Sequence, residues 1–166
     1  MYDGNLRGVR HNAFEIRRAE VTDAEAIAEC LGVAFAQHRD QYTPGAYADT
    51  VLKSDGVVRR LQEMCLFVAV SGREIVGTIG CMVTGLEGHL RGMAVLPGWQ
   101  GTGVALALLR TAEAELLKSS CSSVTLDTTA PLMRAVRFYL KNGYCASGRV
   151  ADFFGMPLYE YRKLLL

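Results

Sequence analysis

The sequence predicts an α/β fold in which a twisted, mixed β-sheet carries helices on both faces. The chain has 166 residues, of which 50% are apolar and 21% charged, as is typical of one globular domain. Strand-like and helix-like stretches follow one another in the order β, α, α, β, β, β, α, β, α, β, β, without repeats. We therefore expect a single domain over residues 13–166, behind a flexible tail, residues 1–12, that shows no periodicity.

The first part of the chain predicts one strand and two helical stretches. Apolar residues from Phe14 begin a short strand, and Thr22 stands three residues before Glu25, which is the spacing of a helix capping box. The helix that follows carries Ala24, Ile27, Ala28, Leu31 and Phe35 on its apolar face. A second helical stretch covers residues 47–64, and we expect a break near residues 54–56 because Gly56 disfavours a helix.

The middle of the chain predicts a hairpin and then a third strand beside it. The runs CLFVAV and REIVGTIGCMV are separated by Ser71 and Gly72, and the glycine can adopt the positive φ that a two-residue turn needs. The run HLRGMAV forms the next strand, which Pro97 ends because proline has no N–H to donate.

The last part predicts two helices, each followed by strand. Residues from Gly103 to about Leu117 are helix formers, and SVTLDTT is rich in β-branched residues that favour a strand. Pro131 suits the first turn of a helix over residues 132–142, and Gly143 suits the position after its end. Two strands, near residues 144–150 and 157–163, complete the sheet.

Charge and composition exclude several classes of function. The net charge is +1, and no block of Lys and Arg gives the positive surface that nucleic acid or an anionic membrane requires. The chain contains no signal-like segment and no apolar run long enough to span a membrane. We therefore expect a cytoplasmic protein that binds neither nucleic acid nor membrane.

The cysteines and histidines predict neither disulfides nor a metal site. The five cysteines lack CxxC spacing, and an odd number cannot all pair, so we expect reduced thiols in the core. His11, His38 and His89 lie far apart in the sequence. No two of them have the i, i+4 spacing at which two histidines of a helix bind one metal ion, so we expect no metal site.

The stretch VLPGWQGTGVALALLR places glycines directly before a helix. A helix N-terminus exposes unpaired N–H groups and attracts phosphate when the preceding backbone can come close, which Gly101 and Gly103 permit. The loop matches neither GxxxxGK[ST] nor GxGxxG. Two interpretations are open from these residues alone, a phosphate cradle and a tight strand-to-helix turn.

Two motifs resemble those of the GCN5-related N-acetyltransferases (GNAT superfamily). HLRGMAVLPGWQGTGVALALL is similar to the central motif of the family, with Gln100, Gly101, Gly103 and Ala105 in place. AVRFYLKNGY is similar to the later signature. The resemblance covers about residues 14–164 and implies the acyl-CoA N-acyltransferase fold. Leu132 departs from the pattern, because an Asn commonly stands there.

The resemblance implies that the protein transfers the acetyl group of acetyl-CoA directly to a primary amine, without a covalent enzyme intermediate. The loop amides of Gln100, Gly101, Thr102, Gly103, Val104 and Ala105 would hold the pyrophosphate. The strand backbone of Met93, Ala94 and Val95 would pair with the pantetheine arm, and a main-chain N–H would polarise the thioester carbonyl. A non-catalytic acyl-CoA-binding or sensory module on the same fold is the alternative.

Proton transfer requires a base and an acid. Strand alternation predicts that Glu87, His89, Arg91, Met93 and Val95 share one face. The resemblance points to His89 as the base, whose imidazole suits proton transfer near neutral pH, with Glu87 and a chain of waters as alternatives. Tyr139 matches the family tyrosine that protonates the leaving thiolate. Tyr139 also fits an apolar helix stripe with Leu132, Val136 and Leu140, so a core position is the other interpretation.

The remaining expectations concern the 3′-phosphate of the cofactor and the cleft that binds the acceptor. Arg134 and Arg137 are candidates for the 3′-phosphate of the cofactor, or are solvated surface residues. In such folds the first helices and the last strands build the acceptor cleft, here residues 37–64 and 149–161. Asp152, Phe153, Phe154 and Tyr159 would make an acidic, aromatic wall for a cationic amine. The same residues fit a homodimer contact or the core equally well.

Overall fold

The computed structural model of the chain describes residues 13–166, so the tail predicted over residues 1–12 lies outside the described residues. The sheet contains β1 (Glu15–Arg18), β2 (Cys65–Ser71), β3 (Glu74–Thr84), β4 (Glu87–Val95), β5 (Ser123–Thr128), β6 (Cys145–Phe153) and β7 (Met156–Leu164). The α-helices are α1 (Ala24–Phe35), α2 (Pro44–Thr50), α3 (Ser54–Glu63), α4 (Val104–Lys118) and α5 (Met133–Lys141). Short 3-10 helices are η1 (Val21–Asp23), η2 (Ala36–Gln41) and η3 (Pro97–Trp99).

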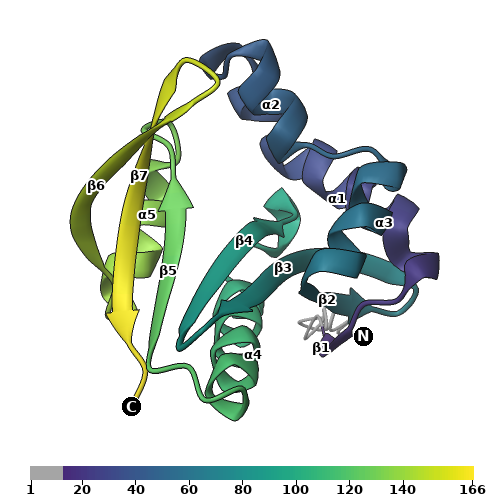
Figure 1. The fold of residues 1–166 in the computed structure, drawn as a ribbon. Coiled ribbons are helices and arrows are strands. Elements are labelled where there is room, and N and C mark those ends of the chain that lie inside the picture. Colours follow the sequence, from purple (N-terminus) through teal and green to yellow (C-terminus); the bar gives the residue numbers. More distant parts are fainter. Residues whose placement is uncertain (1–12) are drawn as a thin grey trace, which may run out of the picture.

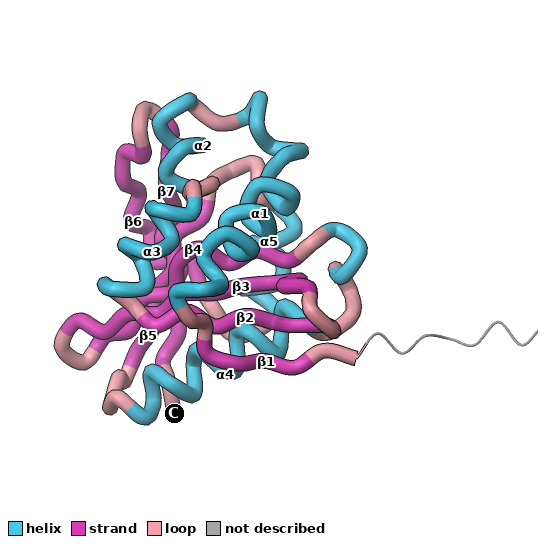
Figure 2. Tube along the Cα trace, turned by 90° about the vertical axis from the view of Figure 1, so that its right-hand side faces the viewer, coloured by secondary structure: helices cyan, strands magenta, loops and turns pink. Residues whose placement is uncertain are grey.

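Helices cover both faces of the sheet, as predicted (Figures 1 and 2). On one face, α1 and α3 pack on β2 and β3 around buried residues such as Ile27, Leu31 and Val57. On the other face, α4 and α5 pack around Leu108, Leu116 and other buried residues. The central strand β3 is buried over most of its length because both layers contact it.

The sheet is mixed, and its one parallel pair opens a gap. The strand order is β1-β2-β3-β4-β5-β7-β6, and all neighbours are antiparallel except β4 and β5. Those two strands pair only from Glu87 to Leu90, opposite Ser123 to Leu126. Beyond Leu90 they diverge, as Figure 1 shows. The backbone edge of β4 that follows Leu90 therefore faces a gap instead of a partner strand.

A β-bulge in β4 overturns the predicted alternation of side chains. Arg91 pairs with Gly80 of β3 and Ala94 with Thr78, so two residues of β4 oppose one of β3 between these pairs. Gly92 has a φ of +65°, a conformation that favours glycine. Because the extra residue inverts the order, Met93 and Val95 pack with Leu90 on the α4 side. The prediction that these two residues share a face with His89 and Arg91 is wrong.

Three local predictions are displaced by a few residues. The N–H of Glu20 donates to Asp23 Oδ2 at 2.8 Å, so the cap at the first helix uses this pair instead of Thr22 and Glu25. The break in the second helical stretch lies at residues 51–53, and Gly56 is inside α3. The hairpin turn is Gly72 and Arg73, with the predicted positive φ of +61° at Gly72.

No helix within residues 13–166 is both long enough and apolar enough to cross a membrane.

Candidate active site

The glycine loop ends in a row of free backbone donors. Gly101 and Gly103 have φ values of +76° and +92°, and Gly103 is the N-cap of α4. The N–H of Gln100 donates to Pro97 at 3.3 Å, and that of Ala107 donates to Gly103 at 3.0 Å. Between them, the N–H groups of residues 101–106 bond to no acceptor within the described part of the chain. This backbone is a ready site for an oxyanion.

The loop opens into a cavity of about 880 Å³ that runs between the diverging strands β4 and β5. Gln100, Gly101, Gly103 and Ala105 line it at one end, and Met93, Ala94 and Val95 follow along β4. Thr102 and Val104 are absent from the lining; the Thr102 hydroxyl donates to the carbonyl of Trp99, and Val104 is buried in the core. Only the backbone N–H groups of these two residues are therefore candidates for the site.

The free edge of β4 directs at least one N–H into this gap. The N–H of Leu96 donates to Val76 of β3 at 2.9 Å. Because successive N–H groups of a strand point to opposite edges, the N–H of Val95 faces away from β3. An extended ligand lying between β4 and β5 would meet this donor.

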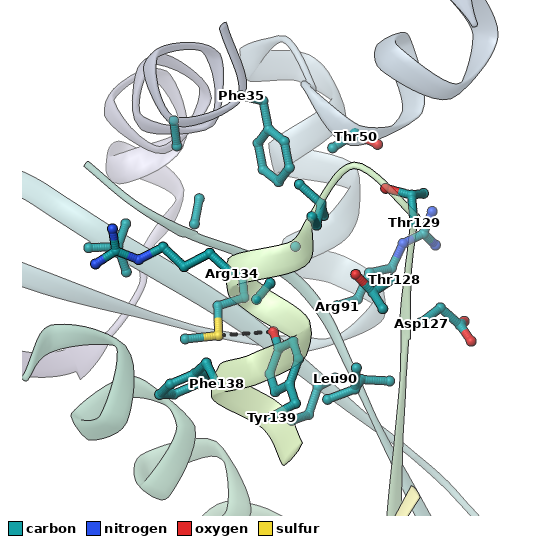
Figure 3. A pocket seen from close by; sticks show the side chains of 18 of the residues that line it. Phe35, Thr50, Leu90, Arg91, Asp127, Thr128, Thr129, Arg134, Phe138 and Tyr139 are labelled. Atoms are coloured by element: carbon teal, nitrogen blue, oxygen red, sulfur yellow. Dashed lines mark hydrogen bonds between the residues drawn. The ribbon is translucent and has the colours of Figure 1, made fainter. Parts of the chain in front are cut away.

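Tyr139 is both a core residue and a cavity residue. Its side chain is 8% exposed and packs edge-on against Phe138 and Tyr144, yet it lines the cavity (Figure 3). The hydroxyl donates to Met93 Sδ at 3.2 Å. Burial raises the pKa of this phenol above its ordinary value, so it holds its proton at neutral pH. Met93 sulfur is a weak acceptor, which leaves the hydroxyl ready for a stronger one.

The cavity-facing stripe of α5 differs from the predicted one. Ala135, Phe138 and Tyr139 face the cavity, whereas Leu140 is 50% exposed. The predicted stripe placed Leu140 inward together with Tyr139, but of these two residues only Tyr139 is buried. Arg134 also lines the cavity, but Arg137 is exposed and does not.

His89 lies in a polar array at the divergence of β4 and β5. Its Nδ1 is 2.9 Å from Thr125 Oγ1, and its Nε2 is 3.5 Å from Asp127 Oδ2. The Thr125 hydroxyl is 3.5 Å from the carbonyl of Gly88, to which it donates. The two ring nitrogens of His89 thus meet two different partners, Thr125 at Nδ1 and Asp127 at Nε2.

Asp127 was missed from the sequence. Burial raises the pKa of its carboxyl, and the neighbouring imidazole of His89 opposes that rise. The signal was present in SVTLDTT, where Thr125 and Asp127 occupy alternate positions and so share a face. What the sequence lacks is the parallel register that sets His89 opposite Thr125.

Glu87 is not brought to the cavity. Its carboxylate lies 3.4 Å from Arg162 and 3.5 Å from the hydroxyl of Ser123, at the closed end of the β4–β5 pair. Glu87 is not among the residues that line the cavity. The geometry gives it an ion-pair role with β7.

The tip of the β6–β7 hairpin approaches α2 (Figure 1). Thr43 Oγ1 donates to the carbonyl of Phe154 at 2.8 Å, and the Phe154 ring packs on Gly45 so closely that a Cβ there would lie 2.7 Å from it. Phe153 lines the cavity, but Asp152, Phe154 and Tyr159 do not. The predicted acidic wall from these last strands is thus reduced to Phe153 and Leu158.

Thr128 carries an unusual buried group. It lines the cavity and is 4% exposed, and its hydroxyl has no hydrogen-bond partner among residues 13–166. A buried hydroxyl without a partner costs about 1–3 kcal/mol. The ligand-free protein therefore loses stability at this position.

Thr128→Val is expected to raise the free energy of unfolding by about 1 kcal/mol, because valine keeps the shape and removes the unpaired hydroxyl. The melting temperature of the ligand-free protein should rise by about 2–4 °C. Thr125→Val is the matched control, since it removes a hydroxyl bonded to His89 and should lower the melting temperature. A decrease for Thr128→Val as large as that for Thr125→Val would contradict the prediction.

Within residues 13–166, no cluster of three or more His, Cys, Asp or Glu side chains is placed to hold a metal ion.

One protein-family model and one curated protein are similar in sequence to this chain. The model of the acetyltransferase (GNAT) family matches residues 25–144. An uncharacterised N-acetyltransferase of Methanocaldococcus jannaschii is 33% identical over 82 residues, which make up 48% of this chain and 52% of that protein. The chain thus matches about half the length of this curated relative.

Solved structures share the fold at low sequence identity. The PaiA N-acetyltransferase of Thermoplasma acidophilum, in complex with coenzyme A, has a TM-score of 0.76 at 17% identity, over 92% of this chain and 99% of that one. The ribosomal-protein-S18-alanine N-acetyltransferase of Escherichia coli has a TM-score of 0.74 at 18% identity, over 92% of this chain and 94% of that one. These likenesses confirm the predicted mixed sheet with helices on both faces.

Proposed function

Because this chain belongs to the acetyltransferase (GNAT) family, we propose that it transfers the acetyl group of acetyl-CoA directly to a primary amine of a small molecule or peptide. Both substrates would be bound together, in a ternary complex. The observation that carries the proposal is that one cavity joins the free N–H groups of the glycine loop to Tyr139 and His89.

The glycine loop is the proposed pyrophosphate site. Each hydrogen bond from an N–H to a charged oxygen contributes about 1.5–3 kcal/mol, so three or four of them would dominate the binding of the cosubstrate. The residues present fit this group, since residues 101–106 offer their N–H groups without a competing acceptor. Arg134, which also lines the cavity, is the proposed contact for a further phosphate.

The acceptor amine must lose a proton before it can attack. An amine with a pKa of about 10.4 needs about 4.6 kcal/mol to become neutral at pH 7. We assign the proton to Nε2 of His89, directly or through one water, because Nδ1 is engaged with Thr125. Asp127, 3.5 Å from Nε2, would then stabilise the imidazolium.

The departing thiolate must gain a proton. The Tyr139 hydroxyl already donates to a sulfur atom, that of Met93, inside the cavity. A thiolate is a much stronger acceptor than a thioether. The Tyr139 hydroxyl would therefore exchange the Met93 sulfur for the thiolate at little cost. Tyr139 is therefore the proposed acid, with its proton retained by burial.

Thiol release from acetyl-CoA, measured across small amines, amino acids, polyamines and peptide N-termini, tests the proposed function. We expect release that depends on the amine, with a mass increase of one acetyl group on the amine and none on the protein. Binding of CoA without thiol release for any amine would overturn the proposal and favour a non-catalytic acyl-CoA-binding module.

His89→Gln is expected to lower kcat by roughly 10- to 100-fold at pH 7, because glutamine keeps a donor to Thr125 but takes up no proton. The deficit should shrink as the pH approaches 10, where solution already supplies the neutral amine. A pH series of kcat for the variant and the parent measures this. An unchanged kcat at pH 7 would assign the base role to water.

A further inference from the structure

Arg60 is a buried cation that faces the cavity. It lies on α3, is 8% exposed and lines the cavity. Its only hydrogen bond to the described residues runs from Nη2 to the carbonyl oxygen of Asp49, at 3.5 Å. Arg60 forms no ion pair within 4.0 Å with any carboxylate of residues 13–166. A buried guanidinium usually has such a partner, because an unpaired charge is costly in the interior.

The β-bulge of β4 makes room for this side chain. A Cβ at Gly92 would lie 2.5 Å from Nη1 of Arg60, so a residue with a side chain at this position would displace the guanidinium. Glycine at position 92 therefore permits both the positive φ of the bulge and the close approach of Arg60. The fold holds a cation at the point where β4 leaves β5.

The neighbouring carboxylate of Asp49 pairs with Arg91 and not with Arg60. Arg91 Nη2 lies 2.6 Å from Asp49 Oδ2, so Arg91 engages the carboxylate nearest to Arg60. Burial and the charge of Arg91 lower the pKa of Arg60 to about 10, so it is still a cation at neutral pH. Glu63 acts on Arg60 and Asp127 on Arg91 electrostatically, but neither carboxylate forms an ion pair with Arg60.

We propose that Arg60, supported by Arg91, binds a carboxylate of the acceptor, so that the acceptor is a small amine that also carries a carboxylate group. This inference rests on the proposed function and names its substrate class. A carboxylate would give Arg60 an ion-pair partner that carries one negative charge, whereas a phosphate monoester would bring nearly two charges close to Asp49, Glu63 and Asp127. The planar guanidinium also matches a carboxylate in geometry.

Thr128 and Thr129 also line the cavity. Figure 3 shows Arg91, Thr128 and Thr129 grouped at one end, with Tyr139 farther along. The Thr129 hydroxyl is already bonded to that of Tyr42 at 2.7 Å, whereas the Thr128 hydroxyl has no partner among the described residues. The Thr128 hydroxyl oxygen is itself buried, so the proposed carboxylate site consists of the two guanidinium groups.

The test compares amines that differ in the carboxylate alone. The initial rate of thiol release is measured with 4-aminobutyrate and with butylamine, whose amines have similar basicity, and with phosphoethanolamine as the phosphate arm. We expect kcat/KM for 4-aminobutyrate to exceed that for butylamine roughly 10- to 100-fold, the range of one or two charge-assisted hydrogen bonds. Equal values, or a preference for the phosphate arm, would overturn the inference.

Arg60→Met is expected to bring this ratio close to one through a higher KM for 4-aminobutyrate. Arg59→Met is the matched control, since the neighbouring Arg59 is exposed and pairs with Asp55 on the same helix. Arg60→Lys, which keeps the charge, should retain part of the preference. Thermal melting and CoA affinity of each variant show whether it is folded. A preference that survives in folded Arg60→Met contradicts the assignment.

A binding experiment separates this inference from the proposed function. Calorimetry with CoA present measures the affinity of 4-aminobutyrate for the parent protein, for Arg60→Met and for Arg59→Met. Binding that is lost only in Arg60→Met supports the carboxylate site even if no amine is acetylated. Thiol release with butylamine and 4-aminobutyrate at equal efficiency, without 4-aminobutyrate binding, would retain the acetyltransferase and reject the carboxylate site.

Discussion

Tyr139→Phe is expected to lower kcat for acetyl transfer roughly 10²- to 10⁴-fold, the usual contribution of a positioned general acid. The substitution keeps the aromatic ring, which packs against Phe138 and Tyr144 with centroid separations of 5.4 and 5.7 Å. Only the hydroxyl and its bond to Met93 are lost. The KM for acetyl-CoA should therefore change little, because the glycine loop is intact.

The pH dependence sharpens this prediction. Burial raises the pKa of the Tyr139 phenol, so its protonated form persists to a higher pH than for an ordinary tyrosine. The deficit of Tyr139→Phe should accordingly stay constant from pH 6 to pH 9. Tyr47→Phe is the control, because Tyr47 lies outside the cavity lining. A kcat within twofold of the parent for Tyr139→Phe would assign the residue to the core alone.

Gly103→Val is expected to weaken the binding of CoA roughly 10²- to 10³-fold, by the loss of two charge-assisted hydrogen bonds. Gly103 has a φ of +92°, which a β-branched residue adopts only under strain. No atom lies within 4 Å of a Cβ at this position, so the effect would come from backbone conformation and not from a clash within the protein. The start of α4 must rearrange, and its free N–H groups then no longer converge.

The matched control for the loop is Gly98→Val. Gly98 lies in η3 of the same loop, has no positive φ, and has no atom within 4 Å of a Cβ. Its substitution should leave the dissociation constant of CoA, measured by calorimetry, within about threefold of the parent. Equal losses for the two variants would show that the loop tolerates neither side chain for reasons unrelated to φ.

The features predicted well are those whose signal is local in the chain. A helix N-terminus preceded by glycines exposes N–H groups wherever the helix packs, so the loop at Gly101 and Gly103 was recognisable from the sequence. Hairpin strands follow from turn residues in the same way, and the C-terminal end of α5 follows from Gly143, whereas Pro131 lies before the N-cap Leu132 and not in the predicted first turn. Tyr139 was identified by its motif and lines the cavity, and its role as the acid stays a prediction.

The features missed depend on register and on contacts between distant segments. His89 and Asp127 approach each other only because β4 and β5 pair in parallel at a register that no local pattern encodes. The bulge at Gly92 changes which side chains of β4 face each side of the sheet. One glycine in a strand is not enough to predict such a bulge. Leu140 and Tyr139 are both apolar enough for a core, and packing alone decided between them.

The sequence by itself thus determined the order of elements and the glycine loop with its free N–H groups, because backbone propensities and short motifs act over a few residues. The tertiary structure alone decided which polar side chains meet. Arg60 from α3, Arg91 from β4 and Asp49 from α2 form one cluster because three segments separated in the chain pack at a single bulge. The pairing of charges in such a cluster depends on these contacts, and no stretch of sequence encodes it.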